Sequence, residues 1–381
     1  MPMSYAEYLA TRHFHGLTGV RALAAVAVVF FHYGGPALGP LQGWIAVHLF
    51  FVLSGFLITT LSLREEDRSG RVSLRAFWVR RVFRIMPVYY TVLALTAVFV
   101  VIGGQYWSSR LGDAMPLYLV FGNELVDYNT PLGMSWTLGV EEKFYFVWPA
   151  LLVLTALAKS RKLWLRTGIC VLSVAAVVFV VLPLTNGEGM GKLAAHYVSL
   201  VIGCLLALLM HHPKGFALVR PLMRPVVAVP VALGFCVFQL FVGDLVPLVG
   251  GIPWFTPIYA LVSSLLLVAV VAPGPVQRLL ACRPLKYIGD RSYGLYLSQV
   301  MAAAVTGVIA PPGWGKAIAT AAVALGIACV LYRWVEMPMI TRGRQLAAKL
   351  PQASPVKART AASEVVSVPA GSNRPKHSRP R

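Results

Sequence analysis

The sequence predicts an all-α, polytopic integral membrane protein with about ten transmembrane helices and both termini in the cytoplasm. Of its 381 residues, 57% are hydrophobic and only 13% are charged, and the mean hydropathy is +0.70. Soluble domains contain roughly 25% charged residues, so this composition belongs to the membrane class. The apolar residues also cluster into runs that approach the roughly 20 residues needed to cross a bilayer.

Each apolar run is expected to form one spanning helix. The runs cover residues 17–33, 44–63, 87–103, 144–158, 167–184, 193–210, 225–243, 257–272, 292–310 and 317–335. Together they predict a single transmembrane domain over residues 1–345. Residues 346–381 are rich in Pro, Ala, Ser and basic side chains, so we expect a disordered cytoplasmic tail that contacts anionic lipid.

The basic residues set the predicted orientation. The formal net charge is +20, and 28 of the 34 Lys and Arg residues fall at the termini or in alternate loops. Cytoplasmic loops carry the excess of Lys and Arg, so these segments are placed inside. The positive charge is therefore topological, and nucleic-acid binding is not expected. The first 15 residues lack an apolar core, so no cleavable signal peptide is expected.

The first run carries two ionisable residues, Arg21 and His32, within GLTGVRALAAVAVVFFHYG. Such groups are costly inside a membrane, which makes each one a functional hypothesis. A separation of 11 residues turns a helix by about 1100° and advances it by about 16 Å. The two side chains should share a face, with His32 nearer the outer leaflet. Alternatively, Arg21 snorkels to the interface and His32 is a buried packing residue.

A second cluster is the arginine-rich segment RRVFRIMPVYY at the start of the third run. Arg81 and Arg84 are spaced i, i+3 and share a helix face, with Arg80 beside them. Guanidinium groups suit phosphates, so we expect this segment to bind a polyphosphate cofactor from the cytoplasm. The alternative is that these arginines are positive-inside anchors.

Two further segments combine polar residues with an apolar pattern. HLFFVLSGFLITT contains His48 and the small residues Ser54 and Gly55, which permit close helix packing. SWTLGVEEKFYFVWP contains Glu141 and Glu142. These carboxylates belong either to an interfacial cluster within an aromatic belt or to a site where they orient an imidazole.

Six segments resemble, in order, the motifs of the type-3 membrane acyltransferase family, which includes O-antigen and exopolysaccharide acetylases and macrolide acyltransferases. They extend over about residues 16–340 and read RALAAVAVVFFH, FFVLSGFLIT, RRVFRIMPVYY, SWTLGVEEKFYFVWP, IGDRSYGLYLSQ and YRWVEMP. The resemblance places the family's Arg/Lys-X10-His motif on Arg21 and His32, and its RxxR motif on Arg81 and Arg84. It places the SGFL element on Ser54.

Two positions depart from the family's pattern. Thr137 replaces the usual Ser in the Trp-Ser-Leu-x-x-Glu stretch, which is a mild change. His48 stands where many relatives have Asp, which leaves any charge role at that position open.

The resemblance implies transfer of an acyl group, most often acetyl from acetyl-CoA, to a hydroxyl, typically on a sugar. We expect His32 to deprotonate the acceptor hydroxyl and Glu142 to orient His32. Ser54 as an acyl-carrying nucleophile is an alternative to direct transfer. No metal is expected. The residues expected to bind the donor are Arg21, Arg80, Arg81 and Arg84.

The expected acceptor is a carbohydrate or lipid-linked glycan of the cell envelope, approached from the outer side of the inner (plasma) membrane. Acylation of a secondary metabolite such as a macrolide is an alternative. From a different functional class, a transporter or flippase would use Arg21, His32 and Glu142 as a proton or substrate path.

Overall fold

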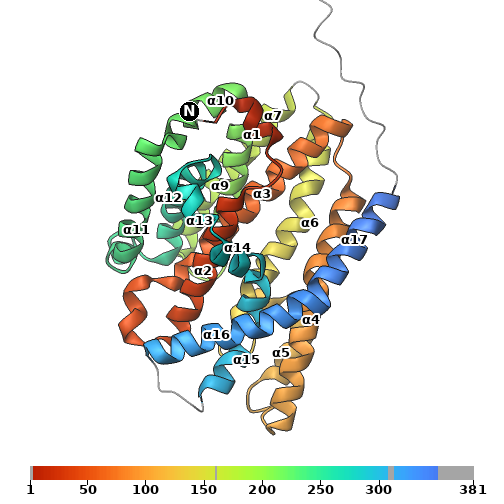
Figure 1. The fold of residues 1–381 in the computed structure, drawn as a ribbon, viewed down its shortest axis with the longest axis vertical. Coiled ribbons are helices and arrows are strands. Elements are labelled where there is room, and N and C mark those ends of the chain that lie inside the picture. Colours follow the sequence, from red (N-terminus) through yellow and green to blue (C-terminus); the bar gives the residue numbers. More distant parts are fainter. Residues whose placement is uncertain (1–2, 159–160, 308–312, 351–381) are drawn as a thin grey trace, which may run out of the picture.

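A computed structural model describes residues 3–158, 161–307 and 313–350, and this part of the chain contains helices and no strands (Figure 1). Each predicted run falls on a helix, which confirms the all-α membrane class. The long helices are α2 (His15–Tyr33), α3 (Ala46–Ser69), α4 (Leu74–Ile102), α6 (Trp136–Ala156), α7 (Lys162–Ala176), α9 (Met190–His211), α11 (Pro225–Leu248), α12 (Ile252–Val271), α15 (Ser292–Gly307) and α16 (Trp314–Leu331).

Shorter elements connect these helices. Two of them, η6 (Val177–Val181) and η8 (Tyr332–Glu336), are π-helical segments within longer helices. The short α-helices are α1 (Tyr5–Ala10), α5 (Leu111–Leu119), α8 (Leu182–Thr185), α10 (Pro213–Val219), α13 (Pro275–Leu280), α14 (Arg283–Asp290) and α17 (Met337–Lys349). The 3-10 turns are η1 (Pro36–Leu41), η2 (Gly43–Ile45), η3 (Asn123–Leu125), η4 (Gly133–Ser135) and η7 (Arg220–Met223).

Eight helical stretches of the described chain are long and apolar enough to cross a membrane, whereas the sequence predicted about ten. The two predicted spans outside this set are α6 and α15. The second turn of α6 carries Glu141 and Glu142, and α15 has only 16 residues. The protein is a multi-pass membrane protein; the exact number of spans and the side of each terminus stay predictions.

The last described helix extends past the boundary predicted between the membrane domain and the tail. Helix α17 continues to Lys349, four residues beyond the boundary predicted at residue 345. Its Gly343 lies against Phe83 of α4, so this helix packs on α4. The rest of the predicted tail, residues 351–381, lies outside the described residues.

Helix α3 lies at the centre of the bundle and packs closely on α9. A Cβ at Gly55 would collide with the carbonyl oxygen of Leu200, and a Cβ at Gly203 would collide with that of Val52. Small residues let membrane helices approach to backbone contact. The prediction that Gly55 permits close helix packing is therefore confirmed. This contact with α9 fixes the position of α3, which carries Ser54.

Helices α2 and α15 run side by side in the same direction. Gly289, just before α15, meets the carbonyl oxygen of Thr18 near the start of α2. Farther along both helices, Ala25 and Val29 of α2 share a buried cluster with Leu295 of α15. The depth of a residue along α15 can therefore be compared directly with the depth of a residue along α2.

A buried ion pair joins α3 to α7. Arg166, only 1% exposed, donates from Nη1 to Oε2 of Glu66 at 2.7 Å and from Nε to Oγ1 of Thr155 at 2.8 Å. Lys162 adds a second cation 3.0 Å from Glu66 Oε1. Because removal of one member leaves a buried charge unpaired, this cluster holds α3, α6 and α7 in fixed relation.

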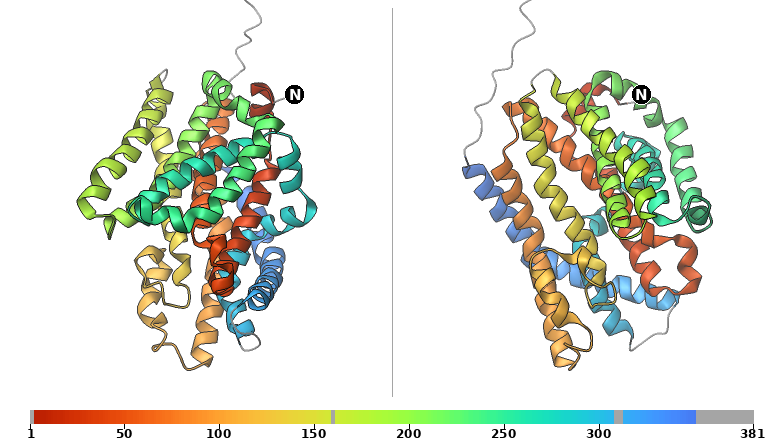
Figure 2. Two further views of the ribbon diagram at one scale, coloured as in Figure 1. Left: turned by 90° about the vertical axis from the view of Figure 1, so that its left-hand side faces the viewer. Right: turned by 180° about the vertical axis from the view of Figure 1, so that it is seen from behind.

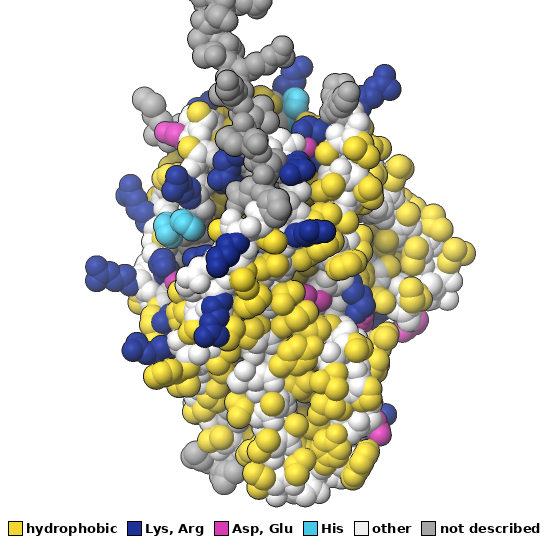
Figure 3. All heavy atoms as spheres, turned by 90° about the vertical axis from the view of Figure 1, so that its right-hand side faces the viewer, with side chains coloured by type: hydrophobic (Ala, Val, Ile, Leu, Met, Phe, Trp, Pro, Cys, Tyr) yellow, Lys and Arg dark blue, Asp and Glu magenta, His cyan; other side chains and the backbone are white. Residues whose placement is uncertain are grey.

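The outer surface is apolar over much of its area. Helices α7 and α11 are largely exposed, with only 11% of the apolar stretches Lys162–Thr185 and Pro225–Leu248 buried, and Figure 2 shows α7 at the edge of the bundle. Figure 3 shows basic side chains gathered toward the upper part of one face, with hydrophobic side chains over the lower part. An apolar surface of this kind is expected to face lipid.

The predicted orientation can be tested at the two ends of α4. Ser108 and Arg71 are exposed and lie in the segments that follow and precede this helix. A cysteine at Ser108 should react with an impermeant maleimide added to intact cells, whereas one at Arg71 should react only after permeabilisation. The background should replace the exposed Cys236 by Ser. Equal labelling of both positions from one side would contradict the predicted orientation.

Candidate active site

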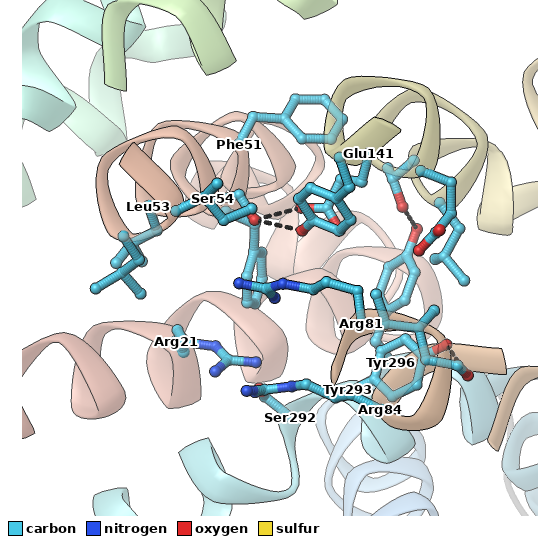
Figure 4. Close-up of a pocket in the computed structure, with 18 of the residues that line it drawn as sticks. Arg21, Phe51, Leu53, Ser54, Arg81, Arg84, Glu141, Ser292, Tyr293 and Tyr296 are labelled. Carbon is cyan, nitrogen blue, oxygen red and sulfur yellow. Dashed lines mark hydrogen bonds between the residues drawn. The ribbon is translucent and has the colours of Figure 1, made fainter. Parts of the chain in front are cut away.

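A cavity of about 180 Å³ lies between α2, α3, α4, α6 and α15 (Figure 4). Ligand pockets commonly enclose about 300–1,000 Å³, so this space accommodates only part of a large ligand. One side of its wall is apolar. The polar side chains of the wall are Arg21, Ser54, Arg81, Arg84, Thr137, Glu141, Glu142, Tyr145, Ser292, Tyr293 and Tyr296.

Three arginines from two helices converge in this cavity. Arg21 comes from α2, whereas Arg81 and Arg84 come from successive turns of α4, and Figure 4 shows their guanidinium groups pointing toward one another. Within the described part of the chain, none of the three forms an ion pair. Guanidinium groups that converge on open space, without a bound carboxylate, form a site for an anion.

A hydrogen-bonded cluster holds one carboxylate beside the arginines. Ser54 donates from Oγ to Oε1 of Glu141 at 2.8 Å, and its Oγ also lies 2.7 Å from the Tyr145 hydroxyl. The guanidinium of Arg81 lies over the Tyr145 ring, 5.0 Å from its centroid. Ser54 therefore connects α3 to α6, and its hydroxyl fixes the Glu141 carboxylate at the cavity wall.

Two further carboxylates lie close to the arginines. Glu142 lines the cavity, and its buried Oε1 has no hydrogen-bond partner among the described residues. Glu336, 2% exposed at the end of the π-helical segment η8, interacts electrostatically with Arg84 and Arg21. These carboxylates offset part of the positive charge, which lowers the cost of holding guanidinium groups inside a membrane protein.

His32 lies outside this cavity, near the end of α2. Its Nε2 is 3.3 Å from the hydroxyl of Tyr128, which belongs to the segment between η3 and η4. Partial burial raises the pKa of the Tyr128 phenol. In the tautomer with a proton on Nε2, the phenol oxygen can accept from Nε2–H, which leaves Nδ1 as the free acceptor of the imidazole. Within the described chain, Glu142 makes no hydrogen bond to His32, and Tyr128 is the side chain within hydrogen-bonding distance of the imidazole.

The Tyr128 backbone is held by its neighbours. Arg110 pairs with Asp127 at 2.6 Å, and the Thr130 hydroxyl donates to the Asp127 carbonyl oxygen at 2.9 Å. A Cβ at Gly133 would collide with the carbonyl oxygen of Tyr128. These contacts direct the phenol toward His32, a juxtaposition across 96 residues that the sequence did not reveal.

Arg80, predicted to bind the donor with its neighbours, is turned elsewhere. Its Nη2 lies 3.1 Å from Oε2 of Glu65, and it is absent from the cavity wall. Adjacent positions on a helix point about 100° apart, so α4 can direct Arg81 inward only by directing Arg80 away. Arg80 is therefore separated from the other candidate donor-binding residues.

His48 occupies a different environment from the cavity. Its Nδ1 lies 3.0 Å from Ser199 Oγ, and its ring stacks on His196 with centroids 5.2 Å apart. Trp136 covers His196 at 4.4 Å. His48 is 2% exposed, so it is a packing residue of the α3–α9 contact, with a hydroxyl partner for its imidazole.

Several residues in or near the cavity were not singled out from the sequence. Ser292 and Tyr296 fall within IGDRSYGLYLSQ, and Glu336 falls within YRWVEMP. Both motifs carried the family resemblance, which was the available signal. Tyr296 donates to the Met134 carbonyl oxygen and lies 3.0 Å from Thr137 Oγ1, so it connects α15 to the start of α6.

Comparison with known proteins agrees with this arrangement. A family model described as an acyltransferase domain matches residues 14–333. The chain belongs to this acyltransferase family. The resemblance inferred from the sequence motifs is thereby confirmed. No solved structure shows a significant match to the chain.

Two relatives of the acyltransferase illustrate its place in the family. The O-acetyltransferase OatA of Staphylococcus aureus is 28% identical over 392 residues, which covers 94% of this chain and 62% of the relative. The peptidoglycan O-acetyltransferase OatA of Listeria monocytogenes is 27% identical over 355 residues, covering 86% of this chain and 56% of the relative. The chain thus spans less than two thirds of the length of either relative.

Proposed function

We propose that this protein is an O-acyltransferase of the plasma membrane that moves an acyl group, most simply acetyl, from acyl-CoA to a hydroxyl of an envelope carbohydrate or glycoconjugate. Membership of the acyltransferase family supports the reaction class. The names of its relatives, which are O-acetyltransferases and in one case act on peptidoglycan, support the acceptor class.

The observation that carries the proposal is the convergence of Arg21, Arg81 and Arg84 in one cavity without an ion-paired partner. Glu141 and Glu142 line the same cavity but are not ion-paired to these guanidinium groups, so the phosphates of a donor can supply their direct partners. Coenzyme A carries its phosphates at one end and its thioester at the end of a long flexible arm. The cavity is too small for the whole donor, so it receives the phosphate end.

The spacing of Arg21 and His32 along α2 supports the position that we propose for the reacting end of the donor. His32 lies on the same face of α2 as Arg21 and about 16 Å farther along the helix. The donor arm is long enough to cover this distance. The thioester is therefore presented beside His32 while the phosphates stay at the arginines, which separates the donor-binding site from the site of acyl transfer.

His32 acts as the general base. As the acceptor hydroxyl attacks the thioester carbonyl carbon, its proton moves to the imidazole, the new C–O bond forms and the C–S bond breaks. The imidazolium then returns its proton to the leaving thiolate. Tyr128 accepts from Nε2–H at 3.3 Å, which orients the ring and leaves Nδ1 as the atom that takes the proton. From the sequence, Glu142 was expected to orient the ring.

Donor affinity tests the role of the arginines. Arg84→Ala should raise the Kd for acetyl-CoA about 10- to 100-fold, since hydrogen bonds to charged groups each contribute about 1.5–3 kcal/mol. Arg84→Lys should recover only part of this, because an ammonium lacks the guanidinium fork. Titration calorimetry on protein in nanodiscs gives the affinities.

Arg80→Ala is the matched control, because Arg80 pairs with Glu65 rather than facing the cavity. It removes the same charge from the same helix and should leave the Kd within about twofold of wild type. An equal loss of acetyl-CoA affinity in Arg80→Ala and Arg84→Ala would show that the arginines of α4 have only a general electrostatic or topological role.

Envelope glycans test the reaction itself. Cells that express the wild-type chain should show an added acyl mass on envelope glycans by mass spectrometry, and cells that express His32→Gln should not. Loss of a general base costs about 10²–10⁴ in rate, and a neutral amide cannot accept the proton. Donor affinity should be unchanged in His32→Gln, because His32 lies outside the cavity.

Two outcomes would contradict this assignment. Substantial acylation by His32→Gln would place the base elsewhere. Failure of His32→Ala to accumulate in the membrane would instead show that His32 is a packing residue.

A further inference from the structure

Gln299 is a buried amide side chain whose polar atoms make no hydrogen bond to the described residues. It is 0% exposed, and within the described residues neither Oε1 nor Nε2 has a hydrogen-bond partner. A buried polar group without a partner costs roughly 1–3 kcal/mol. Native proteins rarely retain such groups without a functional reason.

Gln299 is not part of the cavity wall but lies beyond it on the same helix, α15. Ser292 and Tyr296 line the cavity from α15, and Gln299 follows at i+7 from Ser292. On a helix these three positions fall within about 60° of one another, so Gln299 continues the same face. The next residue back, Ser298, points to another side, where its hydroxyl donates to the Ala324 carbonyl oxygen at 3.2 Å.

Gln299 lies between the two ends of the proposed donor path. It is about 10 Å beyond Ser292 along α15, whereas His32 is about 16 Å beyond Arg21 along α2. The two helices run in the same direction from a common level, as Gly289 and Thr18 show. The Gln299 amide is therefore at an intermediate depth, past the arginines and short of the imidazole.

We infer that Gln299 is a specificity-determining residue that hydrogen-bonds an amide group in the arm of the acyl donor. This inference rests on the proposed function, because it takes the donor to be an acyl thioester of coenzyme A. The arm of coenzyme A contains two amides. A primary amide both accepts from N–H and donates to C=O, so it can satisfy one of these amides completely.

Amide groups also occur on N-acetylated sugars, which are candidate acceptors. The depth of Gln299 favours the donor, since an acceptor approaching from the outer side meets His32 and Tyr128 first. Donor binding measured without any acceptor separates the two sources of the amide.

The test combines one variant with one donor analogue. Gln299→Met keeps the length of the side chain and removes both hydrogen-bonding atoms. Titration calorimetry in nanodiscs should use acetyl-CoA and an analogue whose arm amides are replaced by methylene groups. Gln299→Met should raise the Kd for acetyl-CoA about 10-fold and leave the Kd for the analogue unchanged. Ser298→Ala, the neighbouring control, should change neither value.

Stability gives an independent reading of the same variant. If Gln299 is reserved for a ligand, Gln299→Met should unfold at the same or a higher temperature than wild type, because a costly buried amide is removed. A lower unfolding temperature together with equal weakening for both donors would show that Gln299 supports the fold, for example through a buried water.

The remaining outcomes are also decisive. Unchanged donor affinity with a raised KM for an N-acetylated chitooligosaccharide would assign the amide contact to the acceptor and overturn the inference. Failure of the wild-type protein to bind acetyl-CoA at all would instead refute the proposed donor. The two failures are therefore distinguishable.

Discussion

The structure depends on holding three guanidinium groups together inside a membrane domain. Arg21, Arg81 and Arg84 repel one another, and each is costly to remove from water. Glu141 lines the same cavity, where Ser54 holds its carboxylate by a 2.8 Å hydrogen bond, and Glu336 adds a further negative charge. Close contact between α3 and α9 and the Glu66–Arg166 pair fix α3 and α6, the helices that carry Ser54 and Glu141.

In the proposed function, donor binding and acyl transfer are separated along the same helix, α2. The anion site lies at the level of Arg21, whereas the imidazole lies about three turns farther along α2. A long donor with charge at one end and a thioester at the other is long enough to reach from the arginines to His32. A small anion would occupy only the site at the arginines. Gln299 lies at an intermediate depth and would add a polar contact between the arginines and His32. The helix pair α2 and α15 would then align the whole donor.

Much of the fold and part of the candidate site could be predicted from the sequence, because the helical repeat and the spacing of residues determine which of them share a helix face. The long helices, the shared face of Arg21 and His32, and the proximity of Arg81 to Arg84 all follow from local geometry. Contacts between distant segments do not. Tyr128 meets His32 across 96 residues, and Arg80 turns to Glu65 because tertiary packing selects which face of α4 meets the cavity. The unpartnered amide of Gln299 is likewise a property of the folded environment.

The central claim is that a donor anchored at the arginines presents its reacting end to His32. A coenzyme A derivative with a photoreactive diazirine in place of the acyl group tests this most directly. After irradiation in nanodiscs, peptide mass spectrometry should locate the crosslinks around His32 and Tyr128, and Arg84→Ala should abolish them. Crosslinks confined to residues at the cytoplasmic ends of α3 and α4 would show that the donor binds in another orientation and would contradict the account.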